Sequence, residues 1–184
     1  MEIEAAQRDL GRAYVGGAPG VLASGVVWLV AGLVLASRGV NSAFLALFFG
    51  GMLIQPAAMA ISRLGFRAGP VTRGNPLERL ALETTVLLFA GILIAWVLLR
   101  LAPPAAIPAF AVVMGGRYFA FATLYGDRRY WALGGVIMLV GAACLLRPLM
   151  LNVALGVGVV ELVFAVVLWL RRMPARRAEA AATE

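Results

Sequence analysis

The chain contains no histidine and no lysine, and it has a single cysteine among its 184 residues. Without histidine there is no imidazole to act as a general base or to complete a typical zinc site. Without lysine no Schiff base can form with a carbonyl cofactor. Cys144 has no second cysteine as a partner, so an internal disulfide is excluded. We therefore expect no cofactor, no metal site and no catalytic residue in this protein.

Charge is also scarce, because charged residues make up 14% of the chain and apolar residues 62%. A soluble domain carries about 25% charged residues, so the medium around most of this chain is predicted to be lipid. The formal net charge of +7 comes from 16 basic and nine acidic residues. The basic residues stand between long apolar runs, which indicates a membrane protein and not a protein that binds nucleic acid.

Six apolar runs are long enough to cross a bilayer, since one helical crossing takes about 20 residues. The predicted fold is an all-α polytopic bundle of six transmembrane helices, at residues 19–37, 42–62, 76–99, 106–125, 130–146 and 150–170. Asn75 has the features of an N-cap, with Pro76 at the first helical position and Glu78 three residues after the cap. Pro103 and Pro104 are predicted to break the chain between the third and fourth helices.

The two ends of the chain are more polar than the rest. Residues 1–15 place Ile3, Ala6 and Leu10 at helical spacing among charged side chains, which predicts an amphipathic helix on the cytoplasmic surface. Residues 16–172 are predicted to form the six-helix transmembrane domain. Residues 173–184 are predicted to be a disordered cytoplasmic tail.

Arginines are distributed unevenly between the two sides of the predicted bundle. Twelve fall on one side, whereas Arg38, Arg100 and Arg147 fall on the other and Arg117 lies within a span. Because cytoplasmic loops carry an excess of basic residues, both termini are predicted to be cytoplasmic. We expect a multi-pass protein of the bacterial cytoplasmic (inner) membrane. The arginine clusters on the inner side are suited to anionic lipid head groups, although their role in topology explains them equally well.

The helices also show a threefold pattern of hairpins. Each hairpin has an apolar helix, one arginine at the outer turn and a return helix that contains glycine. Three related hairpins would explain this pattern, and so would the chance similarity of apolar sequences. The small residues Gly50–Gly51, Gly115–Gly116, Gly134–Gly135 and Gly156/Gly158 are predicted to let helices approach closely.

One polar residue interrupts the apolar run of each return helix, 8 to 11 residues before the arginine at its inner end: Gln55, Arg117 and Glu161. At about 1.5 Å per residue, all three lie near the bilayer midplane and are predicted to form one buried polar layer. Glu161 is expected to pair with Arg117, because the two have the same depth and opposite charges. Glu83 is expected to join this layer or to pair with Arg79.

Two functions are compatible with such a layer. The first is a small-solute transporter, channel-like protein or solute-binding membrane module that uses a polar site at the midplane. In that case Tyr118 and Asn152 would help to line the site, and Glu161 or Glu83 would carry a proton. The second is an accessory or structural subunit of a homo-oligomer or a larger membrane complex, in which the buried charges only hold helices together. An enzyme that acts on lipid is not expected, because the residue types for catalysis are missing.

The segments GNPLERLALETT, GGRYFAFATLYGD and YWALGG, together with GGAPG near the start, resemble an uncharacterised bacterial family of short six-helix integral membrane proteins. This resemblance covers nearly the whole chain and implies an architecture without an activity. A second likeness is to HdeD-like acid-resistance membrane proteins. Tyr130–Trp131, Gly134–Gly135 and Pro148 fit their pattern of an aromatic–glycine start and a proline near the outer turn, whereas the first two hairpins depart from it.

Overall fold

The computed structural model describes residues 2–147 and 151–181, with side-chain surroundings up to Leu170. All regular elements among these residues are helical. Six helices are long and apolar enough to cross a membrane: α2 (Ala18–Arg38), α3 (Val40–Ala60), α4 (Leu77–Leu101), α5 (Pro103–Tyr125), α6 (Arg129–Leu146) and α7 (Val153–Ala181). This arrangement confirms the predicted all-α bundle and fits a multi-pass membrane protein.

The ends of two helices show how local sequence sets their boundaries. Asn75 Oδ1 accepts the Leu77 N–H at 3.0 Å, so Asn75 makes the capping hydrogen bond predicted for the start of α4. The fourth span begins at Pro103, three residues before the predicted start at Ala106. Pro103 and Pro104 occupy the first positions of α5, where a missing N–H leaves no helical hydrogen bond unmade.

Three predictions reach residues outside the described part of the chain. The sixth span is predicted to start at Met150, and the likeness to HdeD-like proteins includes Pro148. Both residues lie outside the described part of the chain. The helix α7 is described up to Ala181, so residues 182–184 of the predicted tail lie outside it as well.

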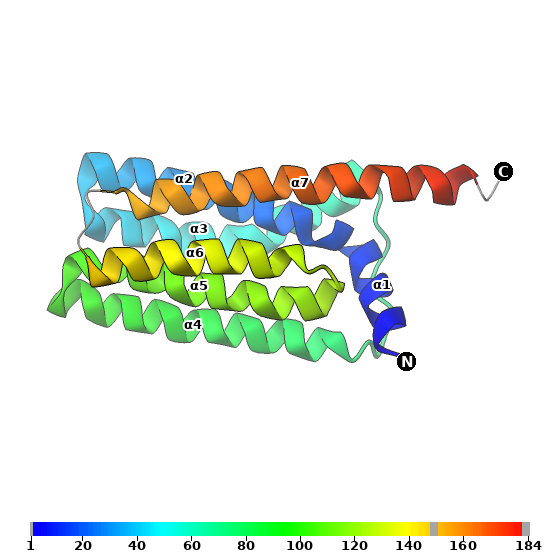
Figure 1. Ribbon diagram of the computed structural model, residues 1–184, viewed down its shortest axis with the longest axis horizontal. Helices are drawn as coiled ribbons and strands as arrows, with labels where there is room; N and C mark the ends of the chain where they lie inside the picture. The colour runs from blue at the N-terminus through cyan, green and yellow to red at the C-terminus, as the bar shows by residue number, and fades with distance from the viewer. Residues whose placement is uncertain (1, 148–150, 182–184) are drawn as a thin grey trace.

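The six long helices lie side by side in two groups of three (Figure 1). In one group α2 packs between α3 and α7, and in the other α5 packs between α4 and α6. The third predicted hairpin, α6 with α7, is packed less extensively than the pairs α5–α6 and α2–α7. The short helix α1 (Ile3–Ala13) lies across one end of the bundle. We call this the α1 end, and it also contains residues 61–76 and 126–128.

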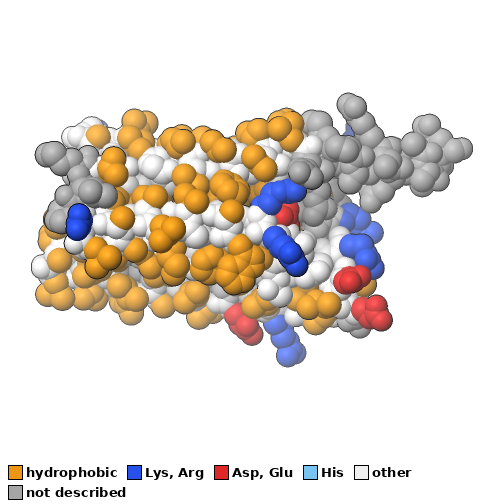
Figure 2. All heavy atoms as spheres, viewed as in Figure 1, with side chains coloured by type: hydrophobic (Ala, Val, Ile, Leu, Met, Phe, Trp, Pro, Cys, Tyr) orange, Lys and Arg blue, Asp and Glu red, His pale blue; other side chains and the backbone are white. Residues whose placement is uncertain are grey.

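The outer surface of the bundle is apolar along its length. Figure 2 shows hydrophobic side chains over the sides of the bundle, with charged side chains gathered toward the α1 end. The least buried spans are α3 and α4, which expose large side chains such as Leu53, Phe89 and Trp96. An apolar surface of this kind is suited to lipid.

Close contact between α5 and α6 depends on glycine. A Cβ at Gly115 would lie 2.6 Å from the Met138 nitrogen and 2.7 Å from the Gly134 carbonyl oxygen. The adjacent Gly116 is open, because a Cβ there would meet only the Met138 Cε atom, at 4.0 Å. The same division holds in each predicted glycine pair, whose closely packed members are Gly50, Gly115, Gly134 and Gly158. Small residues therefore let the helix backbones touch, as the sequence predicts.

The pair α2–α7 is built in the same way. A Cβ at Gly32 would lie 2.7 Å from the Leu155 nitrogen, so the two backbones are in contact there. Two turns away, a Cβ at Gly25 would lie 3.2 Å from the Cβ of Glu161. The close packing of these two helices therefore brings Glu161 against the face of α2.

The amphipathic helix α1 packs against the protein itself. Its apolar residues Ala6 and Leu10 form a small core with Leu77 of α4 and Leu124 of α5. Polar contacts add to this docking, because Gln7 Nε2 donates to the carbonyl of Thr123 at 2.7 Å. The helix α1 is thus attached to the ends of two spans that follow it by more than 60 residues.

Asp9 is the centre of the polar contacts that hold α1. Its carboxylate accepts the N–H and the hydroxyl of Thr72 at 2.9 and 2.8 Å, and the amide of Asn75 at 3.0 Å. Arg12 donates to it from the next turn at 2.8 Å. The hydrogen bond from Asn75, supported by those from Thr72 and by the charge of Arg12, lowers the pKa of the Asp9 carboxyl, against the opposing effect of burial.

We expect Gly115→Ala to destabilise the bundle while Gly116→Ala is tolerated. The added methyl group at Gly115 meets backbone atoms of α6 that cannot move independently, so the cost is about 1–3 kcal/mol. Thermal unfolding of the detergent-purified variants measures the difference. Equal melting temperatures for the two variants would contradict the close α5–α6 contact.

Asp9→Asn should release α1 at neutral pH, because the amide cannot accept all the hydrogen bonds that the carboxylate accepts. The cost is about 1–3 kcal/mol. Because docking lowers the pKa of Asp9 below its ordinary value of 3.8, the ionised carboxylate stabilises docking fully above that value. This contribution is lost as the pH falls from there through the lowered pKa of the folded protein. Hydrogen exchange of the amides of residues 3–17 reports the release.

The matched control for this experiment is Glu4→Gln, because the ion pair of Glu4 with Arg8 is exposed on both sides. This variant should keep the protection of the wild-type protein. Full protection of α1 in Asp9→Asn at neutral pH would show that the apolar contacts alone hold the helix.

Candidate functional site

Glu161 is the most deeply buried charged residue among those described. It lies in the middle of the apolar part of α7, and its side chain has no exposed surface. The hydroxyl of Tyr118 on α5 donates to Glu161 Oε1 at 2.7 Å. This hydrogen bond joins the two groups of three helices in the interior of the bundle.

Two oxygen atoms at this point have no hydrogen-bond partner. Ser24 of α2 lies close to both Glu161 and Tyr118, yet its buried Oγ makes no well-formed hydrogen bond. Glu161 Oε2 is buried and also lacks a partner. Buried polar atoms are nearly always paired, so this cluster of Ser24, Tyr118 and Glu161 has spare capacity to bind.

Arg117 does not form the predicted ion pair with Glu161. The ion pairs among the described residues are Glu4–Arg8, Asp9–Arg12 and Asp127–Arg129, so that prediction is wrong. The half-buried Arg117 points toward α4 and its own helix.

The Arg117 guanidinium lies 4.8 Å from the centre of the Phe121 ring, and its Nε donates to Thr84 Oγ1 at 3.5 Å, a long hydrogen bond. Its charge still acts on Glu161 at longer range. Arg117 therefore belongs to the surroundings of the cluster and not to its contacts.

Three other residues of the predicted layer lie elsewhere. Gln55 on α3 and Glu83 on α4 are exposed on the outside of the bundle, so neither joins a buried layer with Glu161. Asn152 lies at the start of α7, where its Oδ1 accepts the Leu155 N–H at 3.1 Å and its amide donates to the Gly32 carbonyl at 2.7 Å. Asn152 thus caps α7 and ties it to α2 at the end opposite α1.

A column of tyrosines connects the interior cluster to the α1 end. The rings of Tyr118 and Tyr130 stack with their centres 6.1 Å apart, and those of Tyr130 and Tyr125 stack at 5.6 Å. The Tyr130 hydroxyl donates to the Gly16 carbonyl at 2.6 Å, at the bend between α1 and α2. The spacing of Tyr118, Phe121 and Tyr125 places them on one helix face, and this aromatic stripe was a signal available in the sequence.

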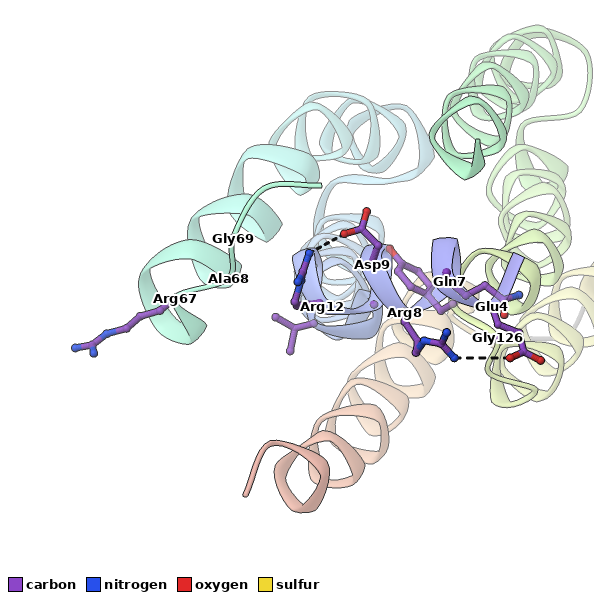
Figure 3. A pocket seen from close by; sticks show the side chains of 13 residues that line it. Glu4, Gln7, Arg8, Asp9, Arg12, Arg67, Ala68, Gly69 and Gly126 are labelled. Atoms are coloured by element: carbon purple, nitrogen blue, oxygen red, sulfur yellow. Dashed lines mark hydrogen bonds and ion pairs between the residues drawn. The ribbon is translucent and has the colours of Figure 1, made fainter. Parts of the chain in front are cut away.

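The column ends at an open cavity beside α1. This cavity has a volume of about 920 Å³ and lies between α1, residues 67–69 and the end of α5, with Tyr125 in its wall. In Figure 3 the Arg8 side chain points toward Glu4 and that of Arg12 toward Asp9, whereas Arg67 points away. The polar side of α1 therefore forms one wall of a water-accessible space at the start of the column.

The chemistry available at the cluster is limited to oxygen ligands. Within the described residues, no three side chains of histidine, cysteine, aspartate or glutamate come together as a group that could hold a metal ion. The cluster offers one carboxyl and two hydroxyl groups, which suits binding of a proton, a hydrogen-bond donor or a small cation. Sequence reasoning did not identify Ser24, because a serine beside glycine in an apolar helix has no distinguishing pattern.

A double-mutant cycle separates the observed contact from the predicted one. Glu161→Met and Tyr118→Phe should be coupled by about 1 kcal/mol, because each removes one partner of a buried hydrogen bond. Glu161→Met and Arg117→Met should be coupled more weakly, because Arg117 acts on Glu161 at longer range and no hydrogen bond or ion pair joins the two side chains. Denaturant unfolding in mixed micelles gives both values. A larger coupling energy for Glu161 with Arg117 than for Glu161 with Tyr118 would support the predicted ion pair instead.

Comparison with known proteins gives a family for the chain but no activity. Neither a curated protein nor a solved structure matches it. One family model, described as a family of unknown function (DUF7010), matches residues 3–171 and so includes α1, all six spans and the Ser24–Tyr118–Glu161 cluster. The chain belongs to this family of unknown function.

Proposed function

We propose that this protein is a small-solute transporter, channel-like protein or solute-binding membrane module whose site surrounds Glu161. One observation carries the proposal: Glu161 is completely buried, and one of its two carboxyl oxygens has no partner. An ionisable residue in the middle of a membrane helix is costly to insert and commonly marks a substrate or ion pathway. Because buried polar atoms are nearly always paired, the oxygen without a partner favours a binding role for this carboxyl group.

The position of the cluster supports this proposal. Glu161 lies eight residues after Val153 and nine before Leu170, so it is about 12–14 Å from either end of the apolar part of α7. Transporters commonly bind their substrates at such a depth. The cluster also draws one side chain from each of α2, α5 and α7, so a shift of any of these helices changes its geometry.

The tyrosine column and the cavity beside α1 are the proposed approach to the site. Tyr125 is common to both, and the column runs from it through Tyr130 to Tyr118. The column is thus the proposed route by which a solute or ion in the cavity reaches Glu161. The proposed function is a non-catalytic one.

The distribution of arginine supports an orientation with the α1 end in the cytoplasm of a bacterial cell. Twelve of the 16 arginines lie toward that side of the sequence-predicted bundle, and basic residues concentrate on the cytoplasmic side of inner-membrane proteins. The exposed Arg8 and Arg12 near the membrane boundary are suited to anionic lipid head groups. Both termini would then be cytoplasmic.

A second candidate function is that of a subunit in a homo-oligomer or a larger membrane complex. Gln55 favours it, because this polar side chain is exposed on the outside of α3 within the apolar span. In lipid, the amide group of a glutamine finds hydrogen-bond partners on neighbouring helices. In this alternative the Glu161–Tyr118 hydrogen bond only fixes the packing of α5 against α7.

The test is the thermal stability of the detergent-purified protein across a library of small polar solutes. A solute that binds the native state at 100 times its Kd stabilises it by about 2.7 kcal/mol. We expect such a shift in the wild-type protein and its loss in Glu161→Gln. The matched control, Glu83→Gln, changes an exposed glutamate of α4 and should keep the shift.

The alternative gives a different result. If no solute stabilises the wild-type protein and Glu161→Gln only lowers the melting temperature, Glu161 is a structural clamp. A Gln55→Leu variant that changes the molecular mass of the protein in detergent would then support the role as a subunit.

A further inference from the structure

The interior cluster lacks the contacts that an ionised carboxylate attracts. A carboxylate draws N–H and O–H donors into short, strong hydrogen bonds. Glu161 has only the one from Tyr118, although Ser24 lies close to it. Within the described part of the chain, Arg117 is the cation that acts on Glu161, and it lies over Phe121 instead of in contact with the acid. Because burial penalises a charge that has no counter-ion in contact, this environment favours the neutral form of a carboxylic acid.

One proton satisfies both unpaired atoms of the cluster. A neutral carboxylic acid has one O–H donor in addition to its acceptor oxygens, and a serine hydroxyl both accepts and donates. With the proton on Oε2, Glu161 can donate to Ser24 Oγ while Oε1 continues to accept from Tyr118. The two buried oxygens without partners then become the two ends of one hydrogen bond.

A metal cation fits the same place less well. Cations held by oxygen take about six ligands, whereas the cluster provides three side chains. The helices α2 and α7 are also closely packed here, because a Cβ at Gly25 would lie 3.2 Å from the Cβ of Glu161 and 3.0 Å from Leu162. A proton needs no additional ligands and no additional volume.

The column of tyrosines places hydroxyl groups between this acid and the cavity. The Tyr118 hydroxyl donates a hydrogen bond to Glu161, and the side chains of Tyr130 and Tyr125 both pack against Gly17. A Cβ built at Gly17 would lie 3.1 Å from the Tyr125 Cζ atom, which carries the hydroxyl group, and closer still to the Tyr130 hydroxyl. Both hydroxyl groups therefore lie at the bend between α1 and α2, next to the water-accessible space.

We propose that Glu161 holds an exchangeable proton, shared with Ser24, and that it exchanges with the α1 end along the tyrosine column. This inference rests on the proposed function and names the ion that the module binds. Among the described residues, the titratable or charged groups that act on Glu161 are Tyr118, which is in contact with it, and Arg117, which acts at longer range. Tyr130 of α6 stacks behind Tyr118, and α2 contributes the uncharged Ser24. The proton leaves Oε2 as H⁺, so the carboxylate that remains takes up donors from Ser24 and Tyr118.

Infrared difference spectroscopy of the protein in lipid vesicles tests this proposal. The wild-type protein should show the C=O stretching band of a protonated carboxylic acid, and this band should be absent from Glu161→Gln and retained in Glu83→Gln. In D₂O the band should shift, because the proton is exchanged for a deuteron. Tyr118→Phe should move the band to higher frequency, since the C=O group loses a hydrogen bond.

The rate of the deuterium shift tests the path. Tyr125→Phe keeps the ring and removes the hydroxyl at the cavity wall, and it should slow the shift several-fold. Trp131→Phe on the exposed side of α6 is the control and should leave the rate unchanged. If Glu161→Gln fails to fold, the frequency shift in Tyr118→Phe identifies the band instead.

Three results would overturn the proposal: no difference band at any pH, a band that never exchanges in D₂O, or an exchange rate that Tyr125→Phe leaves unchanged. The readout is independent of any solute. If the band exchanges but no solute stabilises the protein, the proton site is supported and the proposed solute binding is wrong. If a solute stabilises the protein but the band is absent, the proposed solute binding is supported and the proton site is wrong.

Discussion

The contact of helix backbones at glycine is the constraint on which the rest of this structure depends. Where Gly115 touches α6 and Gly32 touches α7, no side chain separates the helices. These contacts fix the rotation of α5 and α7 about their axes, and with it the direction in which Tyr118 and Glu161 point. The hydrogen bond between them is therefore a result of packing that is set elsewhere in the bundle. In lipid such packing takes the place of the hydrophobic effect between helices.

Hydropathy and capping residues were sufficient to predict the architecture. Apolar runs of 18 to 26 residues correspond to the six spans, because each crossing must satisfy its backbone hydrogen bonds within one helix. Asn75 marked the start of α4 through a local interaction with Leu77, two residues away. Features of this kind depend only on neighbours in the sequence, so they can be predicted without knowing how the helices pack.

The direction of each polar side chain could not be predicted in the same way. Counting residues from a span's end gives depth, and Gln55 and Glu161 are at similar depths, yet one faces outward and the other is buried. Rotation about the helix axis depends on contacts with helices that are distant in sequence. The same reason explains why Arg117 turns to Thr84 and Phe121, and why Ser24 entered the cluster without a sequence signal.

The attachment of α1 has a consequence for the order in which the protein is made. Asp9 and Asn75 are 66 residues apart, and Gln7 and Thr123 are 116 apart. Translation proceeds toward the C-terminus, so α1 leaves the ribosome before the surfaces of α4 and α5 that bind it have been synthesised. Its apolar face, with Ala6 and Leu10, has no partner on these two helices until then. The helix α1 is thus synthesised before α2 and α3 but reaches its final place only after α5 has been made.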